Sequence, residues 1–342
     1  MNNMKIVRIP SPGVISVEEA PKPQVTEGHV LLKINCVGFC GSDLNTYLGR
    51  NLMAKEAVIP GHEIGATVET VGAGVPDFLK PGTVVTVNPY TNCGHCAACR
   101  SGHANACEFN ETLGVQRDGA MREYMVLPWE KIIPAQGLDA RDCALVEPMS
   151  VGFHAVSRAQ VTDSDTVMVF GCGMIGVGAI VRASLRGATV IAVDLDDEKL
   201  ALARRLGAAH AINSKTLDLH ATLMELTAGM GPTVVVEAVG SIPTYQAAIN
   251  EVAFSGRVVC IGYSKNDVTL TTSLFVKKEL HIFGSRNATP ADFEAVIRYL
   301  KRGQCPTSEL ISACIKPDRA LEEMKKWADA PGKYFRIIVD FN

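Results

Sequence analysis

Three glycines at fixed spacing restrict the fold of this chain more than any other feature. Gly171, Gly173 and Gly176 directly follow the apolar segment TVMVF at 166–170 and open a longer apolar segment that ends near Ala188. The short run predicts a buried strand, and the longer one predicts a helix. A G-x-G-x-x-G turn between a strand and a helix is typical of the first unit of a doubly wound parallel sheet.

The alternation of strand and helix continues to about Ser285. Further strands are predicted for the segments TVIAVD, TVVVEAVG, RVVCIGY and ELHIFGS, and a further helix for DEKLALARRLGA. Strands that alternate with helices build a parallel sheet that is covered by helices. We therefore predict an α/β domain with a Rossmann doubly wound parallel sheet in this region.

The glycine-rich turn has the chemistry of a pyrophosphate site. Gly171 permits the tight turn, Gly173 lets the backbone approach a pyrophosphate, and Gly176 allows the helix to pack closely on the strand. Met174 and Ile175 open the helix, whose N-terminus carries the positive end of the helix dipole. A turn that serves packing alone is the alternative.

Asp194 ends the next predicted strand and indicates which dinucleotide binds. A carboxylate at this point can accept hydrogen bonds from both hydroxyls of an adenosine ribose, which favours NAD. The residues at 195–197 are Leu, Asp and Asp and offer no cation for a 2′-phosphate. Arg204 and Arg205 keep NADP open as an alternative.

The rest of the chain predicts a β-rich domain. Short β segments at 30–37, 66–71, 84–87 and 124–126 are separated by Gly and Pro. One helix is predicted between Asp139 and Gln160. The last 55 residues predict helices near 291–301 and 318–328 and a strand at 334–341, which are expected to rejoin the first domain.

Four cysteines with tight spacing predict a structural metal site. The run is C-x2-C-x2-C-x7-C, formed by Cys93, Cys96, Cys99 and Cys107. Four thiolates that converge on one zinc ion leave no open coordination position, so such a site is structural. Free cysteines and an iron–sulfur cluster are the alternatives.

A second group is scattered along the chain: Cys40 in GFCGSD, His62 and Glu63 in PGHE, and Glu147 in ALVEP. Each residue alone fits a structural role, as a buried thiol, a turn residue or a helix cap. Together they supply thiolate, imidazole and carboxylate, a mixed set that binds zinc and leaves room for water or a substrate oxygen.

Composition limits the partners of this chain. Its 342 residues exceed what one core supports, so two domains are expected. The formal net charge of −3 and the lack of a basic run argue against nucleic acid as a partner. No apolar run reaches the roughly 18 residues of a membrane span. The first 20 residues carry charges and prolines in place of an apolar signal core, so we expect a cytoplasmic protein.

These motifs, in this order, resemble the zinc-containing medium-chain dehydrogenases over essentially the full length. The similarity is strongest to the polyol and sugar-acid branch, and GSRNATPADF at 284–293 is similar to the L-galactonate 5-dehydrogenase group. The resemblance implies a GroES-like catalytic domain at 1–150 and 288–342 and a Rossmann NAD-binding domain at 151–287. It also implies a homodimer or homotetramer assembled through the nucleotide domains.

The resemblance implies two zinc ions per chain. Cys40, His62 and either Glu147 or Glu63 hold the catalytic zinc, and Ser42 contacts the substrate hydroxyl and accepts its proton. The four-cysteine run holds the structural zinc. Many relatives carry His five residues after the catalytic Cys, where this chain has Asn45. Since Asn takes up no proton at neutral pH, the proton must leave Ser42 through water, the ribose hydroxyl or a glutamate near the zinc.

The predicted reaction is NAD-linked oxidation of one secondary hydroxyl of a small polyhydroxylated substrate to a ketone. Arg286 is the candidate for binding a substrate carboxylate or hydroxyl, because a guanidinium offers paired planar donors. The loop at 116–118 is a weaker candidate. An L-threonine 3-dehydrogenase and a simple secondary-alcohol dehydrogenase are alternatives within the enzymes. A nucleotide-binding protein without turnover is the alternative outside them.

Overall fold

The computed structural model describes residues 3–342 and divides into two compact units. The first unit contains the residues up to Glu147 together with Thr289–Asn342, and the second contains Pro148–Ala288. The sequence places the two boundaries after residues 150 and 287. Helix α4, Val146–Arg158, begins in the first unit and continues into the second, so the first boundary falls within this helix.

The first unit is built around a seven-stranded sheet. Its order is β14-β15-β3-β4-β5-β7, and β6 also pairs with β3, so that β3 lies at the centre of the sheet. A separate antiparallel hairpin joins β1 to β2. The strands are β1 (Asn3–Ser11), β2 (Val14–Pro21), β3 (His29–Phe39), β4 (Glu63–Val71), β5 (Val84–Val87), β6 (Tyr124–Pro128), β7 (Ile132–Pro134), β14 (Ala313–Ile315) and β15 (Ile337–Asp340).

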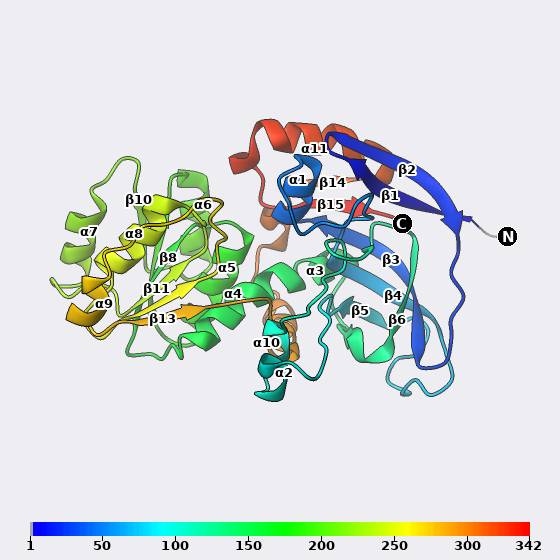
Figure 1. Ribbon diagram of the computed structural model, residues 1–342, viewed down its shortest axis with the longest axis horizontal. Helices are drawn as coiled ribbons and strands as arrows, with labels where there is room; N and C mark the ends of the chain where they lie inside the picture. The colour runs from blue at the N-terminus through cyan, green and yellow to red at the C-terminus, as the bar shows by residue number, and fades with distance from the viewer. Residues whose placement is uncertain (1–2) are drawn as a thin grey trace. The chain divides into compact units, whose positions relative to one another are not determined.

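The central strand β3 is buried along most of its length, because other strands pair with it on both sides and its side chains enter the main core. Val30, Leu32 and Ile34 are fully buried in this core. The last strand, β15, runs antiparallel to β3 and pairs Ile337 with Phe39. The C-terminal segment therefore lies beside the end of β3, as Figure 1 shows by the red and blue strands.

The first unit has short helices at its loops. They are α1 (Gly41–Tyr47), α2 (Ala97–Arg100), α3 (Ala140–Ala144), α10 (Pro290–Leu300) and α11 (Ala320–Asp329). The single helix predicted between Asp139 and Gln160 is wrong, because α3 ends before α4 begins at Val146. Pro148 has no N–H to continue a helix from α3, whereas the first turn of a new helix needs none.

The second unit holds a parallel six-stranded sheet in the order β10-β9-β8-β11-β12-β13. Numbered in chain order from β8, this is the doubly wound order 3-2-1-4-5-6. Successive strands are added on one side of β8 up to β10 and on its other side from β11 onward. Figure 1 shows helices on the faces of this sheet. The strands are β8 (Thr166–Phe170), β9 (Thr189–Asp194), β10 (His210–Asn213), β11 (Val234–Glu237), β12 (Arg257–Cys260) and β13 (His281–Gly284).

Two apolar layers cover the parallel sheet. Side chains of β8 alternate between them, since Val167 and Val169 belong to one cluster and Met168 to the other. Burial on both faces explains why the strands read as continuous apolar runs. The helices are α5 (Met174–Leu185), α6 (Asp197–Arg205), α7 (Leu219–Leu226), α8 (Ile242–Glu251) and α9 (Ser273–Lys277).

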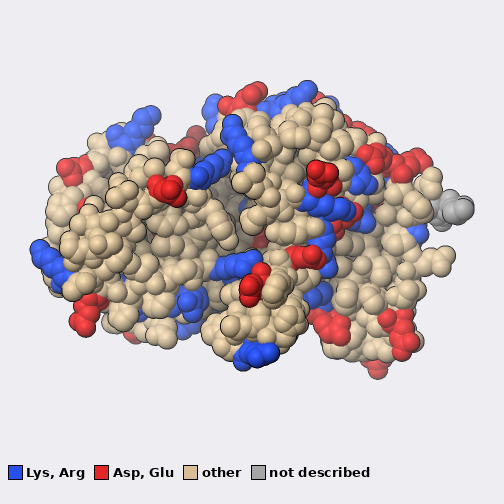
Figure 2. Space-filling view, in the orientation of Figure 1, with Lys and Arg blue, Asp and Glu red and all other residues tan. Residues whose placement is uncertain are grey.

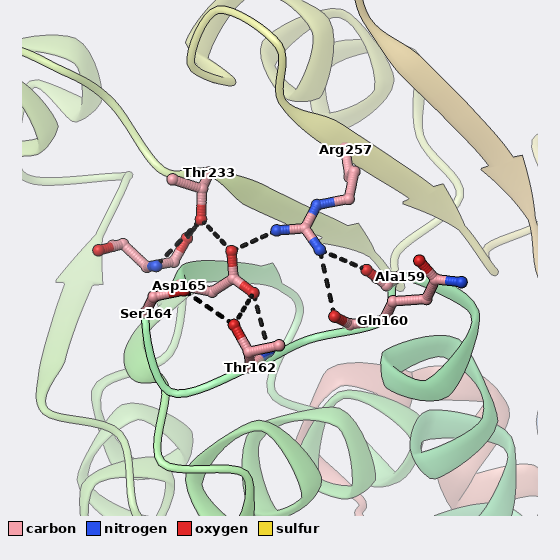
Figure 3. A network of polar contacts seen from close by, with 8 residues as sticks. Ala159, Gln160, Thr162, Ser164, Asp165, Thr233 and Arg257 are labelled. Atoms are coloured by element: carbon pink, nitrogen blue, oxygen red, sulfur yellow. Dashed lines mark hydrogen bonds and ion pairs between the residues drawn. The ribbon is translucent and has the colours of Figure 1, made fainter.

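A polar network closes the amino ends of three strands of this sheet (Figure 3). Asp165, just before β8, forms an ion pair with Arg257 at the start of β12. The same carboxylate accepts hydrogen bonds from Thr233 Oγ1 at 2.8 Å and from the Thr162 backbone N–H at 2.8 Å. Burial acts to raise the pKa of Asp165, but these hydrogen bonds and Arg257 hold it below its usual value.

The visible face carries no large patch of a single charge. Figure 2 shows acidic and basic side chains interspersed among uncharged ones. Across residues 3–342, no helix combines the length and apolar character needed to cross a bilayer.

Candidate active site and metal centres

The scattered metal-binding candidates meet at the paired ends of β3 and β4. Cys40 follows β3 and is the N-cap of α1, while His62 directly precedes β4 and Glu63 begins it. The two strands are antiparallel, with Gly38 opposite Glu63. One ligand atom from each of Cys40, His62 and Glu63 lies within 4.8 Å of the other two. The structure thus brings Cys40 together with the adjacent pair His62 and Glu63, which lies on a different strand.

Cys40 has the surroundings of a thiolate. Its backbone N–H donates to Asp43 Oδ2 at 2.8 Å, which fixes the first turn of α1. Burial acts to raise the pKa of the thiol, but the charge of the His62 ring and its hydrogen bond hold that pKa below the ordinary value. Cys40 in turn raises the pKa of His62 against the opposing effect of burial. A cation is therefore favoured beside this sulfur.

Glu63 is fully buried, and its surroundings are built for a carboxylate. Arg336 Nε lies 3.0 Å from Glu63 Oε2, an ion pair whose angle does not make a hydrogen bond. A Cβ atom at Gly38 would come within 2.2 Å of the same oxygen, so only glycine leaves room for it. Burial raises the pKa of Glu63 well above its usual value, with Arg336 opposing the shift. More positive charge would stabilise the ionised form.

Glu147 enters the site from the first turn of α4. Its Oε1 accepts a hydrogen bond from the phenol of Tyr90, and both side chains are buried. Burial raises the pKa of Tyr90 well above its usual value, and the neighbouring carboxylate adds to the shift. Tyr90 is thus a neutral donor to Glu147. Glu147 is not part of the three-residue set that lies within 4.8 Å.

Several buried polar atoms at this centre have no hydrogen-bond partner among the described residues. They are Ser42 Oγ, Asp43 Oδ1, His62 Nδ1 and both carboxylate oxygens of Glu63. Leaving such groups unpaired is costly, so a ligand is expected to satisfy part of this set. Thiolate, imidazole and carboxylate donors around one point fit zinc, with room for a further ligand.

The four-cysteine lobe is a separate cluster. The sulfurs of Cys93, Cys96, Cys99 and Cys107 all lie within 4.8 Å of one another. Backbone N–H groups point at these sulfurs, including Cys93 N to Cys107 Sγ at 3.3 Å and Cys96 N to Cys93 Sγ at 3.3 Å. Such donors stabilise thiolates, and the one from Cys99 contributes most to lowering the pKa of Cys96 to about 6. Four sulfurs at this spacing fit a closed, structural zinc site.

In the second unit, the glycines occupy the turn between β8 and α5. Gly171 has a φ of 87°, which favours glycine, and a Cβ at Gly176 would lie 1.7 Å from the Gly171 carbonyl oxygen. Gly173 caps α5 without a side-chain hydrogen bond, and a Cβ there would meet no atom within 4 Å. The helix N-terminus, formed by Met174 and Ile175, is therefore open to a phosphate.

Asp194 lies at the end of β9, beside this turn. Its Oδ2 accepts from the Cys172 N–H at 2.7 Å, and its Oδ1 accepts from Leu195 N at 2.7 Å and Asp196 N at 3.1 Å. These backbone donors fix the carboxylate next to the glycine-rich turn. Arg286 follows β13 in the same unit and is half-buried.

The residues of the weaker candidate loop have mainly local roles. Asp118 binds Lys55 Nζ at 3.0 Å and the Ile59 N–H at 3.1 Å, and Gln116 accepts from Thr112 N at 2.9 Å. Arg117 carries a buried Nε without a hydrogen-bond partner within residues 3–342.

Three residues at the centre were missed from the sequence: Asp43, Tyr90 and Arg336. Tyr90 precedes the four-cysteine run without any motif of its own. Arg336 stands directly before the apolar strand β15, where a buried cation is unusual and was the available signal. Its partners, Glu63 and the Phe39 carbonyl oxygen at 2.8 Å, are far away in sequence.

Comparison with known proteins identifies the family. The family model of alcohol dehydrogenase GroES-like domains matches residues 26–137, and that of zinc-binding dehydrogenases matches residues 175–302. L-galactonate-5-dehydrogenase of Escherichia coli is 33% identical over 317 residues, which cover 91% of this chain and 92% of the relative. The chain belongs to the zinc-type medium-chain alcohol dehydrogenase family.

Solved structures agree with this assignment. Galactitol-1-phosphate dehydrogenase from Escherichia coli is similar with a TM-score of 0.91 and 28% identity, covering 98% of this chain and all of that one. An alcohol dehydrogenase from E. coli CFT073, complexed with NADH, has a TM-score of 0.91 and 28% identity and covers both chains completely. The predicted fold class, a GroES-like domain with a Rossmann domain, is confirmed. So are the predicted enzyme class, a zinc-type dehydrogenase, and its cofactors, zinc and NAD.

Proposed function

We propose that this protein oxidises one secondary hydroxyl of a sugar acid or polyol, of the L-galactonate type, to a ketone with NAD as hydride acceptor. The observation that carries the proposal is the set formed by Cys40, His62 and Glu63, with buried polar atoms that lack partners among the described residues. A dehydrogenase family member with this set has the donors for a catalytic zinc. The polyol and galactonate enzymes among its relatives support the substrate class.

Cys40 and His62, with Glu63 or Glu147, would hold the catalytic zinc, and the four-cysteine lobe would hold the structural zinc. When bound, the catalytic ion supplies positive charge that lowers the pKa of a substrate hydroxyl. The buried Ser42 Oγ has no hydrogen-bond partner within the described chain, which suits a first acceptor of the hydroxyl proton. The proton would then pass to solvent without a histidine at position 45, and bound NAD would supply the acceptor for the hydride.

The preference for NAD over NADP is supported by Asp194. Its carboxylate is held by three backbone donors and can still accept from ribose hydroxyls through its remaining lone pairs. A 2′-phosphate at this place would meet the negative charges of Asp194, Asp196 and Asp197. We expect kcat/KM to be much larger with NAD than with NADP.

Two further assignments belong to this proposal. Arg286 is the candidate for binding a substrate carboxylate, and Arg286→Ala should raise KM for a sugar acid; an unchanged KM would exclude that role. A homodimer or homotetramer is supported by the edge strand β13, where Ile282 is 43% exposed, and by Val276 nearby, which is 86% exposed. Light scattering on the full chain measures the assembly, and a monomer would refute it.

The proposal is tested by NAD reduction against aldonates, polyols, L-threonine and simple secondary alcohols, together with zinc content per chain. We expect rapid reduction with one aldonate or polyol, two zinc ions and little activity with NADP. Reduction with L-threonine or a simple alcohol alone would establish one of the alternative enzymes. NAD binding without reduction of NAD by any substrate would favour a binding protein.

A further inference from the structure

Tyr90 lies at the base of the four-cysteine lobe, three residues before Cys93. The chain enters and leaves the lobe through two paired segments: Tyr90 forms an antiparallel bridge with Thr112, and Thr91 N donates to Glu111 O at 3.2 Å. The lobe therefore fixes the backbone from which the Tyr90 side chain extends.

The Tyr90 backbone and ring also make contacts with residues outside the lobe, and these contacts further restrict the side chain. The backbone N–H donates to Asn88 Oδ1 at 3.1 Å, and its carbonyl accepts from Lys131 Nζ at 2.7 Å. The ring packs edge-on against Phe293, with centroids 6.3 Å apart and an interplanar angle of 73°. Only 5% of Tyr90 is exposed, so the phenol has little freedom to turn.

The phenol donates to Glu147 Oε1. A hydrogen bond to an ionised carboxylate is among the stronger kinds and has a defined direction. Glu147 lies at the beginning of α4. Tyr90 thus connects the base of the lobe to one of the two glutamates beside Cys40 and His62.

We propose that Tyr90 is a positioning residue through which the four-cysteine lobe sets the orientation of Glu147 beside the catalytic metal. The inference rests on the proposed function, because it requires a metal ion at Cys40 and His62. It assigns the lobe a role in the chemistry: the lobe determines how one carboxylate is presented to the ion. Partners of metal-site residues typically change metal affinity or activity by about 10- to 100-fold when they are lost.

Tyr90→Phe removes the donor and keeps the ring that packs on Phe293. We expect kcat to fall by about 10- to 100-fold with a smaller change in KM, while two metal ions per chain are retained. Tyr334→Phe is the matched control, because Tyr334 also donates its phenol to a glutamate, Glu323 Oε1 at 3.0 Å, on the helix α11. The control should leave both parameters unchanged.

The deciding readout is the absorption spectrum of the full-length protein with cobalt at the catalytic site, since the d–d bands of Co²⁺ report its ligands. Bands that shift in Tyr90→Phe and not in Tyr334→Phe support the inference. Identical bands in Tyr90→Phe and the parent protein overturn it and leave the proposed function standing. A parent protein that shows bands only from the lobe overturns both.

Lys131→Met is a second variant that tests the same inference and keeps the Tyr90 phenol. It removes the hydrogen bond that holds the Tyr90 carbonyl, so it should shift the cobalt bands in the same direction as Tyr90→Phe, but less. This variant decides the question if Tyr90→Phe fails to fold. Unchanged bands in Lys131→Met would show that the backbone at the base of the lobe does not position Glu147.

Discussion

The two cysteine-containing sites of the first unit are built in opposite ways. The lobe takes four identical ligands from the short segment between Cys93 and Cys107, and nearby backbone N–H groups contact its sulfurs. The site at Cys40 takes unlike ligands from separate segments and depends on side chains from still others, such as Arg336 and Tyr90. The lobe takes all four ligands from one short segment, whereas the ligands of the dispersed site come together only when the sheet has folded.

This difference has a chemical counterpart. In the lobe, the four sulfurs provide a complete tetrahedral set for one ion. At the dispersed site, His62 Nδ1 and the Glu63 oxygens are buried without hydrogen-bond partners within the described residues. Buried polar atoms without hydrogen-bond partners are expected at a position where a metal ion and a substrate bind. The lobe should therefore affect stability first, and the dispersed site should affect turnover first.

The largest effect is expected for Cys40→Ser. Loss of this thiolate should lower kcat by at least about 10³-fold, because the metal contributes several kcal/mol of charge stabilisation and about 1.4 kcal/mol corresponds to a tenfold change in rate. Zinc content should fall from two ions to one, and the melting temperature should fall less than it does on loss of a lobe cysteine. Steady-state kinetics and elemental analysis measure these effects. Full activity with unchanged zinc would remove Cys40 from the site.

Cys107→Ser tests the four-cysteine lobe, the local site of the two. We expect one zinc ion to be lost together with a decrease of roughly 5–10 °C in melting temperature, because metal binding contributes to folding stability. Turnover measured below the melting temperature should fall less than in Cys40→Ser. Calorimetry and limited proteolysis of the lobe measure the effect. Equal losses of activity in the two variants would contradict the division into a stabilising and a reacting site.

The smallest effect is expected for Asp165→Asn in the second unit, where the protein supplies every partner of a buried carboxylate (Figure 3). The free energy of unfolding should fall by about 2 kcal/mol at pH 7. Since the folded pKa of Asp165 is depressed, this stabilisation is complete above the unfolded pKa of about 3.9 and disappears as pH falls through the folded value.

Urea unfolding of Asp165→Asn and the parent protein at several pH values measures this difference. It should be largest at neutral pH and should narrow below about pH 4. Asp163→Asn, at an exposed neighbouring carboxylate, is the control and should be neutral at all these values. A difference that does not narrow at all as the pH falls below about 4 would mean that packing, and not charge, accounts for the effect.

Local chemistry made part of the molecule predictable. The cysteine run and the glycine-rich turn are contiguous, so their spacing alone indicates their geometry. Five of the six parallel strands were predicted, because burial on both faces gives continuous apolar runs, as in β8 and β11. The short edge strand β10, His210–Asn213, was not predicted, because it contains polar residues and its first two residues are only half-buried. The hairpin of β1 and β2 was not predicted, because its second strand, Val14–Pro21, mixes charged and apolar residues and is largely exposed along one face.

Long-range contacts account for what the sequence did not reveal. Arg336 reaches Glu63 because β15 pairs Ile337 with Phe39, a register that no local pattern specifies. Tyr90 meets Glu147 across 57 positions of sequence. The residue types of Cys40, His62, Glu63 and Glu147 suggested metal binding. The pairing of β3 with β4 and of β3 with β15 determines which further side chains meet them.

The absence of a side chain at Gly38 also bears on how the sheet forms. A shift of β3 by one residue against β4 would place Val37 or Phe39 where the Glu63 carboxylate needs space. Chains with that misalignment cannot assemble the three ligands and gain no stabilisation from zinc. Metal uptake during folding should therefore select the correct alignment of these strands, and it would act as a check on sheet assembly as well as an aid to chemistry.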